Sequence, residues 1–460
     1  MLHRRAAEVL HDDPERAAAE PEVITHHFTE AGLDDLAIEW WGKAGDQALR
    51  RSAFQEAIAH LGKAIAMADK AGGLSCQGQR LHVAYGNALI AARGYGAPET
   101  TAAFARARGV GVWRQRRTGA AGGRLRSVGR QSCAGRIAID EKDAATFLSH
   151  IEARPDSAEA GVAHRAAGLT HWFAGEYREA RGHLERAVAL FEPGRDDDLA
   201  FRFGQDTGVA AMLYLALTLW PMGDIERAIS LARDAEARIA GLAHVHTSVF
   251  GEHLAAMFEL MRGNCSRAAP HAVEAARLAR EHDLSLWRAV GVFLDGLARA
   301  AGPLGRGVAD MRRGIQLQRD QNALTFDGLI KIALAESEAR AGDVDRAVAV
   351  IDEALATCER TEYRAFEAEL HRVRGEMLLL RNTSDPAPAE EALRSAIGVA
   401  KQQGTRSFEL RATLALAKLY QAMGRPADAH AVLTPALEGF SPSLEMPEIA
   451  EAMLLSARLA

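Results

Sequence analysis

The sequence predicts an all-α protein, an α-solenoid (superhelix) of helix pairs with a period of about 40 residues. The first observation is a recurring phrase that has a turn residue, alanine five residues later, an apolar residue nine later and alanine twelve later. The second is the even spacing of its copies. The third is the composition, 48% hydrophobic but only 6% aromatic, which suits close helix packing. A fixed period of this size marks a solenoid whose units pack on their neighbours.

Copies of the phrase occur along most of the chain. They begin at Ser52, Gly175, Gly223, Gly263, Gly302, Gly342, Ser384 and Gly424. The copy at Gly302 is degenerate, with Gly307, Met311 and Gly314 at the three later positions. Glycine or serine lets the chain turn between two helices, and the alanines let the helices approach closely. Because one pair cannot bury both of its faces, successive pairs should stack into a continuous core.

The elements before residue 140 follow from local signals. Residues 1–31 are expected to be the remnant of a preceding linker or helical region, with a short helix that begins at Pro21. Residues 32–108 are expected to hold the N-terminal helical repeats. Their helices should span about 35–50, 53–71, 79–93 and 97–108.

Regular pairs are expected over residues 140–440 and a C-terminal capping helix within 441–460. The first helices should span about 158–174, 207–221, 246–262, 284–301, 323–341, 364–381 and 406–423. The second helices should span about 177–191, 224–239, 264–281, 304–318, 343–358, 387–401 and 425–439, and the cap 448–459.

A small residue lies seven positions before the turn in several copies, where the two helices should cross: Gly45, Gly168, Ala216, Ala256, Ala335 and Ala417. This order of residues resembles the tetratricopeptide repeat in a longer form of about 40 residues, over 34–440 apart from 109–139. Asp295 and Met377 depart from it in the copies that turn at Gly302 and Ser384. The resemblance implies a right-handed superhelix that binds ligands on the inward face of its first helices.

A narrower resemblance concerns residues 26–61, 199–228 and 416–440. They are similar to the C-terminal tetratricopeptide-like repeat region of bacterial class III adenylate/guanylate cyclase–signal-transduction ATPase fusion proteins. Residues 2–6, LHRRA, resemble the end of the linker that follows the ATPase. The resemblance implies a sensor or regulatory part whose catalytic and ATPase domains are absent here. Consistent with that, the sequence contains no GxxxxGK[ST] phosphate loop.

We expect no catalytic, cofactor-binding or metal site, and no cofactor. The best metal candidates are His244 and His246 with His253, and the run Asp196–Asp198. The simpler interpretation is a helix start capped by Thr247 or Ser248, and a solvated loop.

Net charge, cysteine content and apolar runs indicate the cellular compartment and the kind of partner to expect. The net charge of −6 predicts no general affinity for nucleic acid. The four scattered cysteines indicate reduced thiols. The first 13 residues lack the apolar core of a signal peptide, and the longest apolar run, 209–222, is too short to span a bilayer. We expect a soluble cytoplasmic protein without a membrane partner.

The segment 109–139 breaks the pattern. Residues 100–139 contain nine arginines and no acidic residue, and 109–136 contain seven glycines. It is interpreted as a nucleic-acid-binding arm, as a flexible insertion, or as a stretch read out of frame after a paired frameshift. Each interpretation predicts poor packing. Translation of the other two frames distinguishes the third from the first two.

The concave face supplies the candidate partner site. Its positions should fall 13, 10, 6, 3 and 2 residues before each turn. In the C-terminal half they include Arg299, Arg340, His371, Arg374, Arg381, Arg411 and Lys418, with Glu336 as the one acid. In the N-terminal half they are mainly apolar: Val162, Leu169, Trp172, Phe173, Leu213, Leu217, Trp220, Phe250, Met257, Leu260 and Met261. A partner with an apolar helix and an acidic segment fits this face. The alternative is that superhelical packing covers the apolar half and that the arginines are solvated.

These features predict a non-enzymatic protein–protein interaction or signal-relay scaffold that binds a protein or peptide, with nucleic acid an improbable partner. The alternative is the truncated tail of an adenylate/guanylate cyclase or of an ATP-binding transcriptional regulator whose catalytic domains are encoded upstream. An ATPase coding region directly upstream would favour the alternative. The absence of a helix-turn-helix pattern before Ala460 weighs against the transcriptional regulator.

Overall fold

A computed structural model describes residues 2–13, 15, 21–71, 76–94, 96–115, 148–149, 154–300, 307–321 and 326–459. The regular elements in these ranges are all helices, 22 in number. They are α1 (Leu2–His11), α3 (Pro21–Glu30), α4 (Asp34–Arg50), α5 (Phe54–Lys70), α6 (Cys76–Arg93), α7 (Pro98–Gln115), α10 (Ala158–Ala174), α11 (Tyr177–Leu190), α12 (Leu199–Phe203), α13 (Thr207–Met222), α14 (Ile225–Ala240), α15 (Val245–Met261), α16 (Cys265–Glu281), α17 (Ser285–Ala300), α18 (Val308–Asp320), α19 (Asp327–Arg340), α20 (Val344–Thr361), α21 (Glu367–Arg381), α22 (Ala387–Gln403), α23 (Arg406–Ala422), α24 (Pro426–Leu437) and α25 (Pro447–Leu459).

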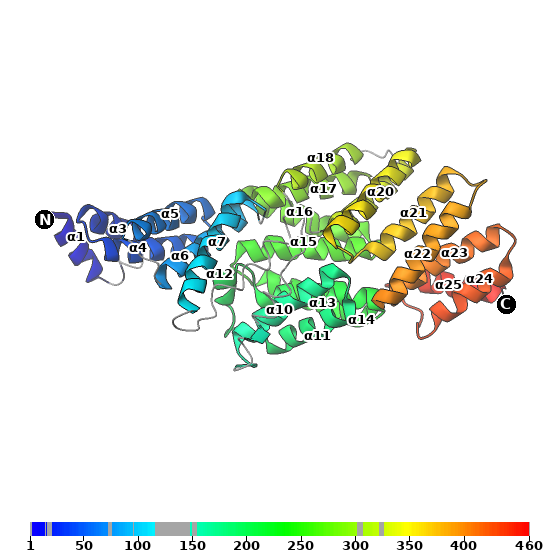
Figure 1. The fold of residues 1–460 in the computed structure, drawn as a ribbon, viewed down its shortest axis with the longest axis horizontal. Coiled ribbons are helices and arrows are strands. Elements are labelled where there is room, and N and C mark those ends of the chain that lie inside the picture. The colour runs from blue at the N-terminus through cyan, green and yellow to red at the C-terminus, as the bar shows by residue number, and fades with distance from the viewer. Residues whose placement is uncertain are drawn as a thin grey trace.

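The helices pack as consecutive pairs, and this confirms the predicted all-α fold class. Each first helix contacts the second helix of its own pair, from α4 with α5 to α23 with α24. Neighbouring pairs then contact one another through α5 and α6, α16 and α17, or α22 and α23. Figure 1 shows the resulting elongated array, with α1–α7 at one end and α21–α25 at the other.

The small residues before each turn are where the two helices of a pair meet. A Cβ atom built on Gly45 would lie 2.4 Å from Cγ of Leu61, and one built on Gly168 would lie 2.6 Å from Cγ of Leu184. Contacts that short do not occur between real side chains, so glycine is required at both crossings. The alanines five and twelve residues after each turn are buried, as predicted: Ala57, Ala64, Ala180, Ala187, Ala228, Ala235, Ala268, Ala275, Ala347, Ala354, Ala389, Ala396, Ala429 and Ala436.

The turn residues have the backbone that the phrase requires. Gly175 and Gly223 end their helices with φ of 78° and 96°, in the left-handed region that favours glycine. Ser52 occupies the same position with φ of 59°, although it has a side chain. The backbone at Ser52 is therefore strained, because a left-handed conformation costs an L-residue about 1–2 kcal/mol.

Replacing Ser52 by glycine should raise the free energy of unfolding by about 0.5–1 kcal/mol, because relief of this strain exceeds the extra entropy that glycine gains in the unfolded chain. Urea unfolding measured by circular dichroism tests this expectation. Ser384→Gly is the matched control, because Ser384 has the same place in the phrase without a positive φ. That variant should lose about 0.5–1 kcal/mol. Equal changes in the two variants would contradict the explanation.

The superhelix contacts itself after one turn. The end of a first helix, or the turn that follows it, meets the start of another first helix or of α25 between 183 and 193 residues later. Tyr177, the first residue of the second helix α11, makes one of these contacts. The hydrogen bonds are Ser285 Oγ to Ala92 O (3.0 Å), Arg364 N to Phe173 O (2.8 Å), Tyr177 Oη to Ala365 O, Ser407 Oγ to Trp220 O (2.7 Å), and Arg262 Nη2 to Glu445 Oε2. These contacts join parts of the array that are far apart in the sequence.

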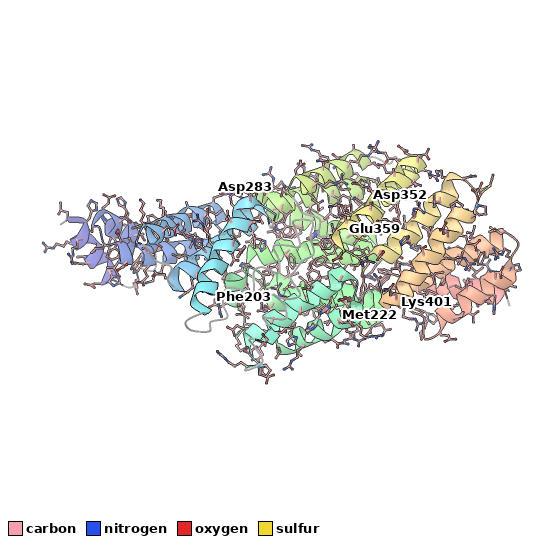
Figure 2. All side chains as sticks on the ribbon, viewed as in Figure 1. Phe203, Met222, Asp283, Asp352, Glu359 and Lys401 are labelled. Carbon is pink, nitrogen blue, oxygen red and sulfur yellow. The ribbon has the colours of Figure 1, made fainter. Side chains whose placement is uncertain are left out.

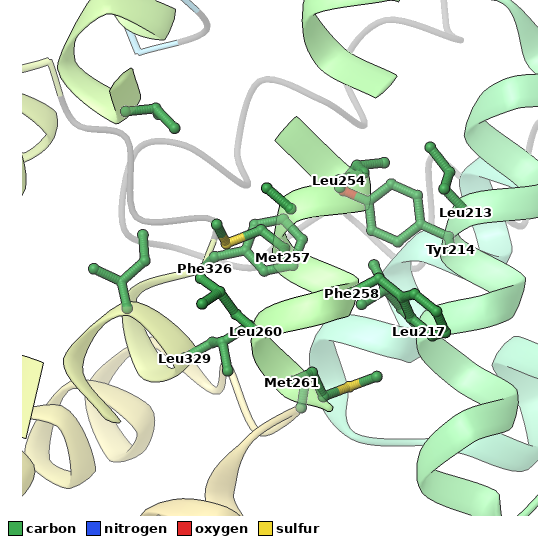
Figure 3. Packing of buried hydrophobic residues seen from close by; sticks show 14 of the residues in the cluster. Leu213, Tyr214, Leu217, Leu254, Met257, Phe258, Leu260, Met261, Phe326 and Leu329 are labelled. Atoms are coloured by element: carbon green, nitrogen blue, oxygen red, sulfur yellow. The ribbon is translucent and has the colours of Figure 1, made fainter. Parts of the chain in front are cut away.

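One consequence is that the apolar inner positions of the N-terminal half are covered. Trp172 is fully buried against Phe326 and Phe366, with ring centroids 5.5 Å and 5.6 Å apart. In Figure 3, residues of α15 lie between two other parts of the core, since Phe258 points to Leu217 of α13 while Leu260 lies beside Leu329 of α19. Superhelical packing therefore accounts for most of the apolar half of the predicted face, with Leu169 half-buried, whereas Leu260 and Met261 also line a cavity.

The predicted irregular segment 109–139 differs in part from the structure and in part lies outside the described residues, as do residues 140–147 and the turn at Gly302. Helix α7 continues to Gln115, although the sequence predicted its end near Arg108 and no helix beyond. Extension of an existing helix gains one hydrogen bond for each residue that it fixes and avoids the cost of forming a new first turn. The rest of the predicted irregular segment, residues 116–139, lies outside the described residues. At the other end, α25 packs against α23 and α24.

Candidate functional site

A cavity of about 460 Å³ opens on the inner face of the C-terminal half. Its walls come from the first helices of five pairs, α15, α17, α19, α21 and α23, and from α25. Apolar side chains form much of the lining: Leu260, Met261, Leu297, Leu329, Ile332, Phe366, Leu379, Leu414 and Leu419. Ligand sites in proteins are typically concave, largely apolar and about 300–1,000 Å³ in volume, so this cavity has the size and character of a binding site.

The floor of the cavity is a buried network of charges. Both Nε and Nη2 of Arg372 donate to the carboxylate of Glu369 at 3.0 Å, and Nη1 of Arg411 reaches the same carboxylate at 3.3 Å. Burial alone would raise the pKa of Glu369, but the two guanidinium groups hold it below its ordinary value. Glu369 is therefore a buried anion that two arginines stabilise.

Arg411 connects this network to the superhelical turn. Its Nε donates to Glu448 Oε1 at 2.8 Å, and its Nη1 and Nη2 donate to the carbonyl oxygens of Met261 and Arg262 at 2.9 Å and 3.1 Å. Its guanidinium also lies 4.6 Å from the centre of the Trp220 ring. These contacts join α23 to α13, to the end of α15 and to α25.

The more accessible charged residues of the cavity are Glu336, Glu376, Arg340, Lys418 and Glu451. Burial raises the pKa of Glu336; Arg372 opposes that shift, and Glu376 and Glu369 add to it. Its side chain nevertheless keeps 44% of its surface exposed, because it faces the cavity. Lys418 Nζ forms an ion pair with Glu451 at 2.7 Å.

The structure brings three of the seven predicted partner-binding residues to the cavity: Arg340, Arg411 and Lys418. The other four lie elsewhere. Arg299 pairs with Asp310 at 3.1 Å, and Arg374 pairs at 2.7 Å with Asp352, which Figure 2 labels on α20. His371 is half-buried beside Arg374, and burial lowers its pKa. Arg381 is exposed at the end of α21.

The register of α21 explains why three of them, His371, Arg374 and Arg381, do not line the cavity. Its crossing residue is Gly375, whose added Cβ would lie 2.7 Å from Cγ of Leu393, and not Met377. The inward positions of α21 therefore move two residues toward its N-terminus, and the residues that line the cavity are Glu369, Arg372, Glu376 and Leu379. In α17 the crossing residue is Gly296 instead of Asp295, which moves the inward position from Arg299 to Ala300. Gly375 and Gly296 were the sequence signals that identify the correct register.

The histidines considered as metal ligands are structural. Within the described ranges, no three His, Cys, Asp or Glu side chains form a group that could hold a metal ion. His244, and not Thr247 or Ser248, caps α15, and accepts a hydrogen bond from Thr247 N at 3.3 Å. His246 Nδ1 lies 2.8 Å from the carbonyl oxygen of Gly204.

The run of three aspartates is paired with arginines. Arg195 contacts Asp196 at 2.7 Å, Arg238 contacts Asp197 at 2.8 Å, and Arg50 contacts Asp198 at 2.9 Å. The last two pairs join this loop to α14 and α4. The loop therefore links neighbouring repeats, which is a structural role that the sequence did not indicate.

Comparisons with known proteins found a sequence relative and solved structures of low similarity. No family model matches the chain. An uncharacterized protein of Rhizobium meliloti (strain 1021) is 25% identical over 253 residues, which are 55% of this chain and 24% of that protein. The observation that decides the structural class of the repeat is the series of helix pairs along the chain, each of which crosses at a small residue. The chain is a tetratricopeptide-like, all-helical repeat protein.

Three solved structures are similar over most of this repeat protein. The human IFIT1 dimer with m7Gppp-AAAA has a TM-score of 0.41 and 15% identity, and the match covers 99% of this chain and 89% of that one. Yeast Tom70 has a TM-score of 0.34 and 12% identity, with 97% and 96% covered. The APC/C hetero-tetramer Cut9–Hcn1 has a TM-score of 0.41 and 13% identity, with 99% and 87% covered.

Proposed function

We propose that the chain is a non-enzymatic interaction scaffold and that its inner cavity binds a segment of a protein partner. The observation that carries the proposal is the cavity itself, which five first helices and α25 build from apolar walls and a fixed charged floor. The floor is rigid, because Glu369, Arg372 and Arg411 hold one another through several hydrogen bonds. A rigid, amphipathic concave surface binds an ordered segment without a large entropic penalty to the scaffold.

A signal-relay role is the finer part of the proposal. It rests on the resemblance of residues 26–61, 199–228 and 416–440 to the repeat region of cyclase–ATPase signalling proteins. A cytoplasmic location belongs with this role. Among the described helices, none has both the length and the apolar character needed to cross a bilayer. An ATPase coding region directly upstream, in frame or nearly so, would support the signalling role.

Photo-crosslinking from inside the cavity tests the scaffold function. p-Benzoylphenylalanine placed at Ala415 or Ala422, which line the cavity, should crosslink a partner protein in cells. The same residue at Ala427, exposed on α24, is the control and should give no such product. Crosslinked bands that are equally strong from Ala427, or absent from both cavity positions in folded protein, would overturn the proposal.

A further inference from the structure

The charges that line the inner cavity do not cancel, and this imbalance identifies the chemistry of a partner. The lining carries five carboxylates, Glu336, Glu369, Glu376, Glu448 and Glu451, against four cations, Arg340, Arg372, Arg411 and Lys418. The sequence had predicted a basic surface with Glu336 as its one acid. The inference rests on the proposed function, because it assumes that this cavity is the partner site.

The imbalance is largest at the floor, where two guanidinium groups serve four carboxylates. Arg372 donates from Nε and Nη2 to Glu369 and from Nη1 to Glu376 at 2.8 Å. Its distance to the Glu336 carboxylate is longer, 4.0 Å. Arg411 is divided between Glu369 and Glu448. Oε2 of Glu448 is buried without a hydrogen-bond donor from the described residues. The deep part of the cavity therefore has an excess of negative charge.

Two of these carboxylates can be reached from the cavity. The side chains of Glu336 and Glu376 keep 44% and 38% of their surface exposed, and both approach Arg372. Burial is the main cause of the raised pKa of Glu336, and Arg372 opposes it. The neighbouring carboxylates Glu376 and Glu369 raise that pKa further, and only this part of the shift reflects the excess of negative charge.

The remaining cations offset this excess only in part, since Arg340 lowers the pKa of Glu336 less than Arg372 does. Lys418 is paired with Glu451 at 2.7 Å, and both side chains are about half exposed. Arg340 is exposed and donates to Glu336 O at 3.2 Å and to Ser337 Oγ at 3.1 Å. Solvent screens these exposed charges, and in part the similarly exposed Glu336 and Glu376, much more than it screens the buried Glu369.

We propose that the cavity binds a protein segment in which a lysine or arginine lies beside apolar side chains, with its cationic group at Glu336 and Glu376. Leu329, Ile332 and Leu379 come from the same two helices as these carboxylates and line the same cavity, so they offer an apolar surface for the aliphatic stem. The partner's charge is therefore opposite to that of the acidic segment expected from the sequence.

Three labelled peptides test the proposal by fluorescence anisotropy. They are 12-residue fluorescein-labelled sequences with one shared leucine and alanine framework that differ only in carrying lysine, glutamine or glutamate. The lysine peptide should bind about ten- to hundredfold more tightly than the glutamate peptide. Added salt should weaken the binding of the lysine peptide most. The double variant Glu336→Gln, Glu376→Gln should remove the preference for lysine over glutamine, while glutamine at 376 still gives Arg372 an acceptor.

Glu391→Gln is the matched control, since Glu391 is exposed on α22 and does not line the cavity. It should leave all three affinities unchanged. A glutamate peptide that binds as tightly as the lysine peptide, or a preference for lysine that survives the double variant, overturns the proposed charge but leaves the scaffold function standing. Absence of binding by all three peptides also overturns this inference, while crosslinking from Ala415 judges the scaffold function separately. Binding of 6-aminohexanoate as tight as that of the lysine peptide would assign the cavity to a small amine instead of a protein segment.

Discussion

Replacing Arg411 by alanine should lower the free energy of unfolding by about 3–5 kcal/mol, the effect expected when one partner of a buried ion network is removed. The Arg411 side chain is only 9% exposed. It donates to Glu369, Glu448 and the carbonyl oxygens of Met261 and Arg262. Its loss would leave Glu369 paired with one guanidinium group, that of Arg372. It would also remove the hydrogen bonds that Arg411 donates to the carbonyl oxygens at the end of α15. Urea unfolding monitored by circular dichroism measures the change.

Arg374→Ala is the control for this prediction, because the same sequence rule placed both arginines on the concave face. Arg374 is 34% exposed and pairs with Asp352, which is 48% exposed, so its loss should change stability by at most about 0.5 kcal/mol. Equal losses in the two variants would contradict the role assigned to Arg411. Because Arg411→Ala is expected to destabilise the fold, weaker capture of a partner by this variant is informative only if the stability of the variant is measured as well.

The helix pairs were predictable from the sequence because their determinants are local. The phrase places alanine, an apolar residue and alanine on one face of the second helix. Those positions are buried in every copy that has both alanines, as at Ala180, Leu184 and Ala187. The turn glycines follow from the same logic, since Gly175 and Gly223 need a positive φ. Such patterns depend on contacts within one pair, which lie close together in the chain.

The candidate site was only partly predictable, for two physical reasons. The first is register. Loop residues between α21 and α22 displace the crossing from Met377 to Gly375, and a shift of two residues turns a helix by about 200°. Arg374 then faces α20, and Arg372 faces the cavity.

The second reason is that pairing of charges across the superhelix has no local signature. Arg411 contacts Glu369, which lies 42 residues earlier in the sequence, and the carbonyl oxygen of Met261, which lies 150 residues earlier. A rule that examines each first helix separately counts the arginines but misses their partners. The contacts after one superhelical turn, such as Ser407 with Trp220, are hidden for the same reason.

Acidification from pH 7 to pH 5 should destabilise the superhelix through its buried histidines. Burial lowers the pKa of His253 and of His244 to about 3, with the charge of His246 as a second cause at His244. Burial lowers the pKa of His246 to about 4 in spite of its hydrogen bond to Gly204. In the unfolded chain a histidine titrates near pH 6.5. Below that pH the unfolded state binds protons that the folded state excludes, so the free energy of unfolding falls by about 2 kcal/mol per histidine at pH 5.

His253→Met isolates one of these contributions. The His253 ring lies 5.3 Å from Trp287 and 5.4 Å from Phe326, and its buried Nδ1 has no hydrogen-bond partner among the described residues. Methionine fills a similar volume without a titrating group, so the variant should be at least as stable as the original at pH 7. Between pH 7 and pH 5 it should lose about 2 kcal/mol less than the original protein. His26→Met, on the exposed side of α3, should lose as much as the original. A buried neutral histidine at position 253 resists protonation, so its removal must reduce the loss of stability on acidification. If His253→Met loses as much unfolding free energy as the His26 control between pH 7 and pH 5, the acid sensitivity comes from other groups.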